Sequence, residues 1–413
     1  MREQFERAGW QVVPFSEEAD VYIINTCTVT SKADSKARQS IRQAKRRAPS
    51  SLVVAVGCYP QVYADEVKGV GADVVLGNAE KASIVDIVEK ALSSGAPFVE
   101  VSSLDDRFYP MAIDRFFGYS RAFVKIQDGC DKRCTYCVVW KARGPSRSAP
   151  LDFVVDEVKR LASEGYEEVV LTGTNLGDYG KKEGSSLMEL LDKLSEIDEL
   201  KKIRLSSIEP VDLTHDFLKY LSENEKVCRH LHIPVQSASD RILKLMGRSY
   251  GKKELLSVFE RVFSLIEDVG VGIDVIVGFP TESEEDFRET YAFIEELPIY
   301  YMHIFSFSPR PQTPAYHLKP RVRPDVIRKR WEILNELKAR KRQDFVSKFV
   351  GKSICGVVES RAFDDRYWSA VSENYIPLLV EGEPSFLAGL ARKVLTFRVK
   401  EARGDKLVVS ALC

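Results

Sequence analysis

Three cysteines lie close together in the segment DGCDKRCTYCVVWKARG, residues 128–144, as Cys130, Cys134 and Cys137. Their C-x3-C-x2-C spacing suits three thiolates on one tight loop, which can bind three irons of a [4Fe–4S] cluster and leave the fourth iron open. A structural zinc site would need a fourth ligand, and no other Cys or His lies nearby in the sequence. We therefore predict an iron–sulfur site, with zinc or inert core cysteines as the alternatives.

Two further cysteines follow apolar runs near the amino end. Cys27 stands in INTCTVT, and Cys58 comes directly after LVVAVG, residues 52–57. Because the carboxyl ends of parallel strands meet at one edge of a sheet, both sulfur atoms are predicted at that edge, and the alternative is two unrelated, half-buried cysteines. Cys228, Cys355 and Cys413 are predicted to be structural or incidental.

The elements that position these cysteines follow from the apolar pattern. Strands are predicted at 20–26, 52–57 and 73–76, with helices near 31–48, 61–67 and 80–92. This alternation favours a parallel α/β sheet. A longer βα series follows and predicts a partial or complete parallel barrel. Its strands are expected at 122–127, 168–173, 202–208, 230–235, 272–278 and 302–307.

The domain prediction covers the whole chain of 413 residues. A first α/β domain spans 1–102, a linker 103–120, the βα barrel 121–318 and a basic helical connector 319–343. Short strands with turn residues over 344–413 predict a small all-β barrel. The fold class is therefore α/β with a terminal β-barrel.

Composition limits the classes of partner. The net charge is −1, so any nucleic-acid surface must be local. The amino end has no apolar segment of a signal peptide, and no run approaches the roughly 18 apolar residues that span a bilayer. We expect a cytoplasmic monomer without a membrane partner, in a compartment where thiols stay reduced.

The cysteine loop, with Tyr136 before its last cysteine, resembles the signature of radical S-adenosylmethionine (SAM) enzymes. The resemblance implies that Tyr136 packs near the SAM adenine and that the open iron is chelated by SAM, which is split into methionine and a 5′-deoxyadenosyl radical. It also implies SAM or substrate contacts at the later strand ends. The alternative is that these polar residues cap the helices that follow. The predicted contacts are Arg143, Thr172, Gly173, Thr174, Asn175, Ser206, Gln236, Ser237 and Asp274.

The motifs NTCTVT, GCYPQ, LTGTNLGDYG, SSIEP, HIPVQSAS, DVIVGFPTESEEDF and SFSPRPQTPA are similar to those of the methylthiotransferase branch of this family, and the terminal barrel looks like a TRAM domain. The resemblance implies a second [4Fe–4S] cluster in the first domain, held by three cysteines that include Cys27 and Cys58. NTCTVT and SSIEP look most like the type that acts on N6-threonylcarbamoyladenosine (t6A) in tRNA. The types acting on isopentenyladenosine or on a ribosomal protein are the enzyme alternatives.

The chain departs from the family pattern at two places. Trp140 stands where a proline is usual, which should alter the loop without removing a ligand. The strand and Gly-Cys turn that carry the first auxiliary-cluster cysteine are missing before MREQFERAGWQVV, so we expect a start truncated upstream. An RNA-binding protein with one cluster and no sulfur insertion is a further alternative.

The helix predicted at 31–48 is basic. Lys36, Arg42, Arg46 and Arg47 are its predicted RNA contacts, and a merely solvated face is the alternative. The implied partners are tRNA and an electron donor such as flavodoxin or ferredoxin, with the sulfur donor left open. The five histidines form no cluster in the sequence, and His230 and His232 are predicted to be structural.

Overall fold

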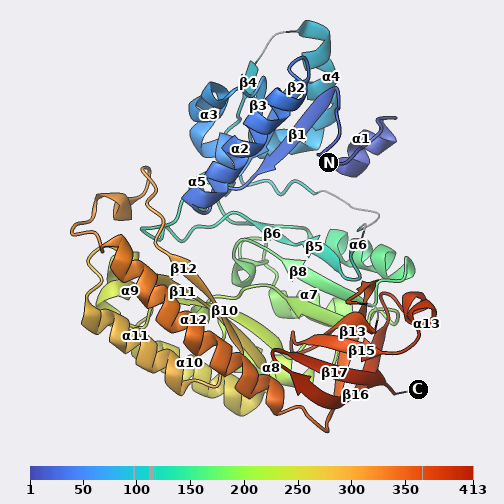
Figure 1. Cartoon of the computed structure of the whole chain (residues 1–413), viewed down its shortest axis with the longest axis vertical. Helices are drawn as coiled ribbons and strands as arrows, with labels where there is room; N and C mark the ends of the chain where they lie inside the picture. Colours follow the sequence, from blue (N-terminus) through green and yellow to red (C-terminus); the bar gives the residue numbers. More distant parts are fainter. Residues whose placement is uncertain (96–97, 111–115, 117, 365, 413) are drawn as a thin grey trace. The chain divides into compact units, whose positions relative to one another are not determined.

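The computed structural model describes residues 1–95, 98–110, 116, 118–364 and 366–412 (Figure 1). Contacts divide the chain into two compact units. The first contains residues 1–113, 128–147 and 308–317, and the second contains 114–127, 148–307 and 318–413. The loop with the three clustered cysteines thus belongs to the same unit as the amino-terminal sheet.

The first unit is built on a four-stranded parallel sheet. Its strands β1 (Val21–Thr26), β2 (Leu52–Gly57), β3 (Val74–Leu76) and β4 (Phe98–Glu100) lie in chain order. The helices are α1 (Arg2–Arg7), α2 (Ser31–Arg47), α3 (Cys58–Val70), the 3-10 helix η1 (Ala79–Ser83), α4 (Ile84–Ser94) and α5 (Val139–Arg143). The three strands predicted here are present. Strand β4 was not predicted, because its three half-buried or exposed residues lack an apolar run.

The helix after β1 shows why this sequence folds locally as it does. The Thr30 hydroxyl accepts the Ala33 N–H and caps α2. Ala37, Ile41 and Ala44 recur at helical spacing and are buried against the sheet. The basic residues between them are left toward solvent, so the helix is amphipathic.

The second unit contains six parallel strands with intervening helices. Strands β5 (Ala122–Lys125), β8 (Glu168–Thr172) and β9 (Lys202–Leu205) form one sheet, and β10 (His230–Gln236), β11 (Gly270–Val277) and β12 (Tyr301–Ser306) form another. A parallel bridge between Ser207 and His232 joins the two sheets. The order matches the predicted partial barrel. The short strands β6 (Gln127–Asp128) and β7 (Arg147–Ser148) lie where the chain passes between units.

Helices separate the barrel strands as the βα pattern predicts. They are α6 (Leu151–Ser163), η2 (Leu176–Asp178), α7 (Leu187–Ser195), η3 (Pro210–Asp212), α8 (His215–Glu223), α9 (Asp240–Met246), α10 (Lys252–Leu265) and α11 (Glu284–Glu296). The 3-10 helix η4 (Pro314–His317) lies in the segment that belongs to the first unit. Among the described residues, no helix is long and apolar enough to cross a membrane.

The basic connector is a long helix, α12 (Pro324–Ser347), which leads to a closed terminal barrel. The barrel order is β13 (Ser353–Ala362), β14 (Tyr367–Ser372), β15 (Pro377–Glu381), β17 (Lys406–Ala411) and β16 (Val394–Arg403), and α13 is Pro384–Gly389. The turn between β14 and β15 contacts the βα barrel, because Arg204 donates to the carbonyl oxygens of Ser372 and Glu373 at 2.9 Å each.

Candidate functional site

The cysteine loop presents three thiols on a short stretch of backbone. Cys134 is buried, and Cys130 and Cys137 are half-buried. The Cys137 N–H donates to the Cys134 carbonyl at 3.0 Å, and the Val139 N–H donates to Cys137 Sγ at 3.4 Å. An N–H directed at sulfur stabilises a thiolate. The loop therefore fits three thiolate ligands of a cluster.

A glycine closes the base of this loop. Gly129 has φ +79°, and a Cβ there would lie 1.8 Å from the Pro145 carbonyl oxygen. The next residue, Cys130, donates its N–H to the Gly144 carbonyl at 3.1 Å. Only glycine lets the two ends of the loop approach so closely, which explains the Gly before the first cysteine.

Cys27 and Cys58 end two adjacent parallel strands. Thr26 and Gly57 are register partners in β1 and β2, and each cysteine is the next residue along its strand. The Thr26 hydroxyl donates to the Val56 carbonyl at 2.9 Å and accepts the Tyr59 N–H at 3.3 Å, which ties the two strand ends together. The structure thus places both cysteines at one sheet edge, as the strand pattern predicts.

Polar groups surround these two thiols. Asn78 Nδ2 lies 3.5 Å from Cys58 Sγ and also donates to the Ala142 carbonyl at 2.7 Å. Cys58 is the first residue of α3, where the helix dipole favours negative charge. The Val29 N–H donates to Cys27 Sγ at 3.5 Å. Both sulfurs therefore lie in surroundings that suit thiolates.

Arg143 connects the cysteine loop with these thiols inside the first unit. Burial alone would lower the pKa of Arg143, but the neighbouring Cys58, Asp128 and Cys27 groups raise it overall. Helix α5, which carries Arg143, packs against α3. A permanent cation thus lies beside two sulfur atoms that become anionic when they bind iron.

The structure places the other described cysteines elsewhere. Cys228 and Cys355 belong to the second unit, where burial raises the pKa of both thiols, that of Cys355 to about 11. Cys413 lies outside the described residues. Within the described part of the first unit, Cys27 and Cys58 are the two cysteines available for the three-cysteine set that the resemblance implies.

The turn after β8 is built around a buried glutamine of the second unit. Gln127 Oε1 accepts the Asn175 N–H at 2.8 Å, and a Cβ on Gly173 would lie 2.9 Å from the same oxygen. Thr172 donates its hydroxyl to the Val124 carbonyl at 3.2 Å, and Thr174 is half-buried. Asn175 Oδ1 is buried without a hydrogen-bond partner among the described residues, so a polar acceptor remains for a ligand.

The remaining predicted contacts differ in backbone conformation and in whether their polar atoms already have a neighbour in the protein. Ser206 Oγ is buried and has no partner in the described part of the chain. Gln236 has φ +68°, an unusual conformation for a residue with a side chain. Ser237, in contrast, is 1% exposed, and its hydroxyl lies 3.1 Å from that of Thr290 in α11. The Ser237 hydroxyl is thus engaged with α11, whereas the N-cap of the helix that follows is Ser239.

The histidines are grouped in the structure in a way that the sequence does not indicate. The structure brings His230, His232 and His303 together around Tyr301, whose Oη lies 2.9 Å from His230 Nε2 and 3.1 Å from His232 Nδ1. His232 Nε2 also lies 2.9 Å from Asp274 Oδ1. His303 and Asp274 are far in sequence from His230 and His232 of β10, and they meet because β10, β11 and β12 are neighbours, so the sequence carries no local signal.

A buried ion pair near Cys27 was also missed. Arg310 pairs with Asp34 of α2, and the Thr28 hydroxyl donates to Asp34 Oδ1 at 2.7 Å. Arg310 and Asp34 are 2% and 6% exposed. The pair holds the segment 308–317 against the start of α2. The only signal in the sequence is the Arg of SFSPRPQTPA.

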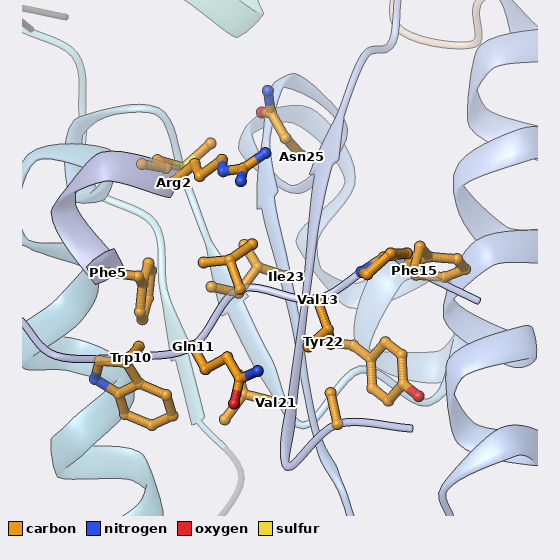
Figure 2. A pocket seen from close by; sticks show the side chains of 14 residues that line it. Arg2, Phe5, Trp10, Gln11, Val13, Phe15, Val21, Tyr22, Ile23 and Asn25 are labelled. Atoms are coloured by element: carbon orange, nitrogen blue, oxygen red, sulfur yellow. The ribbon is translucent and has the colours of Figure 1, made fainter. Parts of the chain in front are cut away.

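Most of the predicted RNA contacts on α2 lie on the surface. Lys36, Arg42 and Arg46 are exposed. Arg47 is half-buried, donates to the Phe15 carbonyl, and its guanidinium lies 5.6 Å from the centre of the Phe15 ring. A pocket of about 330 Å³ lies beside β1. Figure 2 shows Phe15 at one end of this pocket and Phe5 and Trp10 at the other. Arg47 thus helps to hold the amino-terminal segment.

The cysteine loop and the six parallel strands define a radical SAM protein. Residues 124–294 match the Radical SAM superfamily, and residues 1–77 match the Uncharacterized protein family UPF0004. A solved radical SAM methyltransferase, TsrM from Kitasatospora setae, shares the fold with a TM-score of 0.55 and 16% identity over 73% of this chain and 64% of its own.

Similar curated proteins identify the branch of the radical SAM superfamily. The chain is 43% identical, over 91% of its length and 93% of the relative's, to threonylcarbamoyladenosine tRNA methylthiotransferase MtaB of Aquifex aeolicus. It is 38% identical to the protein of that name in Thermotoga maritima, over 81% of this chain and 77% of the relative. It is 36% identical to a tRNA-2-methylthio-N(6)-dimethylallyladenosine synthase of Thermotoga petrophila, over 91% of this chain and 86% of the relative. The chain belongs to the radical SAM methylthiotransferase family, whose cofactors are SAM and two [4Fe–4S] clusters.

Proposed function

We propose that this protein adds a methylthio group to C2 of t6A beside the anticodon of tRNA. The observation that carries the proposal is the 43% identity, over nearly the full length of both chains, to a relative named for that reaction. The five cysteines of the first unit support it, because a loop for one cluster and two strand ends for another are held in one compact body.

The residues have separate tasks in this proposal. Cys130, Cys134 and Cys137 hold the cluster that binds SAM, and Cys27 and Cys58 hold the auxiliary one. When bound, these groups supply radical activation of a C–H bond and transfer of sulfur. Arg143 offsets the negative charge of the thiolates, and Asn78 donates a hydrogen bond to Cys58 Sγ. The Asn175 and Ser206 oxygens are the available acceptors for SAM.

Mass spectrometry of tRNA nucleosides tests the substrate. Deletion of the gene should abolish the 2-methylthio derivative of t6A, and the restored gene should return it. Loss of the 2-methylthio derivative of isopentenyladenosine instead would assign isopentenyladenosine in tRNA as the substrate. Unchanged levels of both nucleosides would reject a tRNA substrate and favour the ribosomal protein.

One observation favours a second candidate, an RNA-binding protein with a single cluster. The described first unit supplies only two cysteines at the auxiliary position. Iron counting after reconstitution of the full chain separates the candidates. About eight irons per chain would support two clusters, whereas about four would support one.

The remaining assignments belong to the same proposal. The exposed face of α2 with Lys36, Arg42 and Arg46 contacts tRNA phosphates. A flavodoxin or ferredoxin supplies electrons, and the protein acts as a cytoplasmic monomer. Neutralising Lys36, Arg42 and Arg46 together should lower the salt dependence of tRNA binding, because each phosphate contact releases counterions.

A further inference from the structure

An aromatic face runs along β12 in the second unit. Tyr301, His303 and Phe305 stand at alternate positions and so point to one side of the strand. Their ring centroids lie 5.4 Å apart for Tyr301–His303 and 6.4 Å apart for His303–Phe305. Tyr301 is buried, but His303 is exposed and Phe305 is 41% exposed. Two exposed rings on a rigid strand form a surface on which a flat ligand can stack.

A fixed carboxylate lies beside these rings. Asp274 of β11 is the register partner of His303, and its Oδ1 is 2.9 Å from His232 Nε2. Tyr301 orients the His232 ring from the other side, at 3.1 Å from Nδ1. Gly272 makes room for this arrangement, since a Cβ there would lie 2.1 Å from the Tyr301 ring. Asp274 Oδ2 accepts no hydrogen bond from the described residues and remains for a ligand.

A basic cavity adjoins the aromatic face. Its volume is about 400 Å³, and Tyr301 and His303 form part of its lining. The charged residues of the lining are five basic side chains and one acidic one, namely Arg121, Lys338, Arg342, Arg361, Lys406 and Glu359. Burial lowers the pKa of Lys338, as does its neighbour Arg342. Arg121 and Arg361 lie near Glu359, and Arg342 and Lys406 pair with Asp405. The five basic side chains outnumber these two carboxylates, so the lining keeps an excess of positive charge that attracts an anion such as a phosphate.

We propose that this place binds one nucleotide of the RNA substrate. The base stacks on Phe305 and His303, Asp274 accepts an N–H of the base, and the basic cavity takes an adjoining phosphate. Stacking together with cationic contacts is how single-stranded RNA is commonly bound. The inference rests on the proposed function, because it assumes an RNA substrate.

Two other occupants fit the charges less well. SAM also carries an adenine, and the sequence predicts Asp274 as a SAM contact, but SAM has a net positive charge that the basic lining repels. A divalent ion would use His232, Asp274 and His303, whose ligand atoms all lie within 4.8 Å of one another. The same lining repels that ion, and Phe305 would have no role. The nucleotide is the occupant that uses every feature.

The test uses the reconstituted full chain and a synthetic anticodon hairpin with 2-aminopurine in place of the modified adenosine. Binding should quench the 2-aminopurine fluorescence because the base stacks. Phe305→Leu should remove the quench and weaken hairpin binding roughly five- to one-hundredfold, while the affinity for SAM stays unchanged. Phe305→Tyr, which keeps the ring, should behave as the wild type. The matched control is Phe386→Leu, since Phe386 is 61% exposed on α13 and lines no part of this cavity.

Three outcomes would overturn the inference, and the first two concern other occupants of the site. One is that Phe305→Leu loses SAM affinity but keeps hairpin binding and quenching, which would make this the SAM adenine site. The other is a stoichiometric zinc or manganese ion in the wild type that Asp274→Asn removes. Product formation is measured separately, on a matching hairpin that carries t6A. Quenching that depends on Phe305, without methylthio product on the t6A hairpin, would support the inference and reject the proposed function. Methylthio product on the t6A hairpin, with unchanged 2-aminopurine quenching in Phe305→Leu, would support the proposed function and reject the inference.

Discussion

Gly57 lies where the strand ends that carry Cys27 and Cys58 approach each other, so a substitution there tests this close approach. It has φ +114° and ψ −147°, a region that only glycine occupies readily. A Cβ there would lie 2.8 Å from the Thr26 carbonyl oxygen and 3.0 Å from Asn25 Oδ1. Thr26 is the register partner of Gly57, so Gly57→Ala must push β1 away from β2 or distort the backbone before Cys58.

The magnitude follows from two contributions. A side chain in this region of φ and ψ costs about 1–3 kcal/mol, and the steric overlap adds about 1–3 kcal/mol because a backbone atom cannot move aside. The free energy of unfolding should fall by about 2–6 kcal/mol. Gly71 has a similar φ of +109°, but a Cβ there meets nothing within 4 Å. Gly71→Ala should therefore cost only about 1–2 kcal/mol.

Urea unfolding of the apo full chain, followed by tryptophan fluorescence, measures this difference. Iron counting after reconstitution gives a second readout, since displaced strand ends should retain the auxiliary iron poorly in Gly57→Ala and normally in Gly71→Ala. Equal destabilisation by the two substitutions, with equal iron content, would refute the argument from the close approach of β1 and β2.

Three further predictions concern charged side chains. Arg310→Met should lower the free energy of unfolding by about 3–5 kcal/mol, because Asp34 is left buried without its cation. In a double-mutant cycle, the double variant Arg310→Met/Asp34→Leu should recover much of that loss. Additive losses from the two substitutions would contradict this. Burial alone would raise the pKa of Asp286, but hydrogen bonds, first from Arg241, lower it overall. The stability that comes from this lowered pKa is present above about pH 4 and is lost as pH falls through the pKa of the folded state. Asp286→Asn should therefore reduce the slope of unfolding free energy against pH, on the acid side, by up to about 1.4 kcal/mol per pH unit. Parallel curves for the wild type and the variant would contradict this. Arg143→Gln should lower iron retention after desalting, whereas Arg143→Lys should keep most of it; equal loss in both would show that charge is not the cause.

The local elements could be predicted because their causes are local. Apolar, β-branched runs such as LVVAVG form buried strands wherever they are placed in a parallel sheet, and Thr30 caps α2 through a neighbour three residues away. The cysteine loop could be predicted for the same reason, since its three ligands stand within eight residues. Strand β4 escaped prediction because a short strand without an apolar run is specified by its neighbour β3.

The groups of side chains that were missed depend on pairing between distant segments. His232, Asp274 and His303 come from three strands, and nothing in the sequence near any of them indicates the other two. The Arg310–Asp34 pair joins residues on opposite sides of the whole βα barrel sequence. Such contacts are decided by strand order and register, which hydrophobic patterns alone do not specify.

The sequence by itself determined the class of chemistry, because iron binding needs thiolates at a short spacing that any fold of that loop preserves. It also determined the α/β architecture, because alternating apolar periods leave few alternatives. Only the tertiary structure decided that Arg143 lies beside Cys27 and Cys58, and that β12 carries an aromatic face next to Asp274. These features arise from packing between segments far apart in the chain, where burial and register, and not local preference, select the partner.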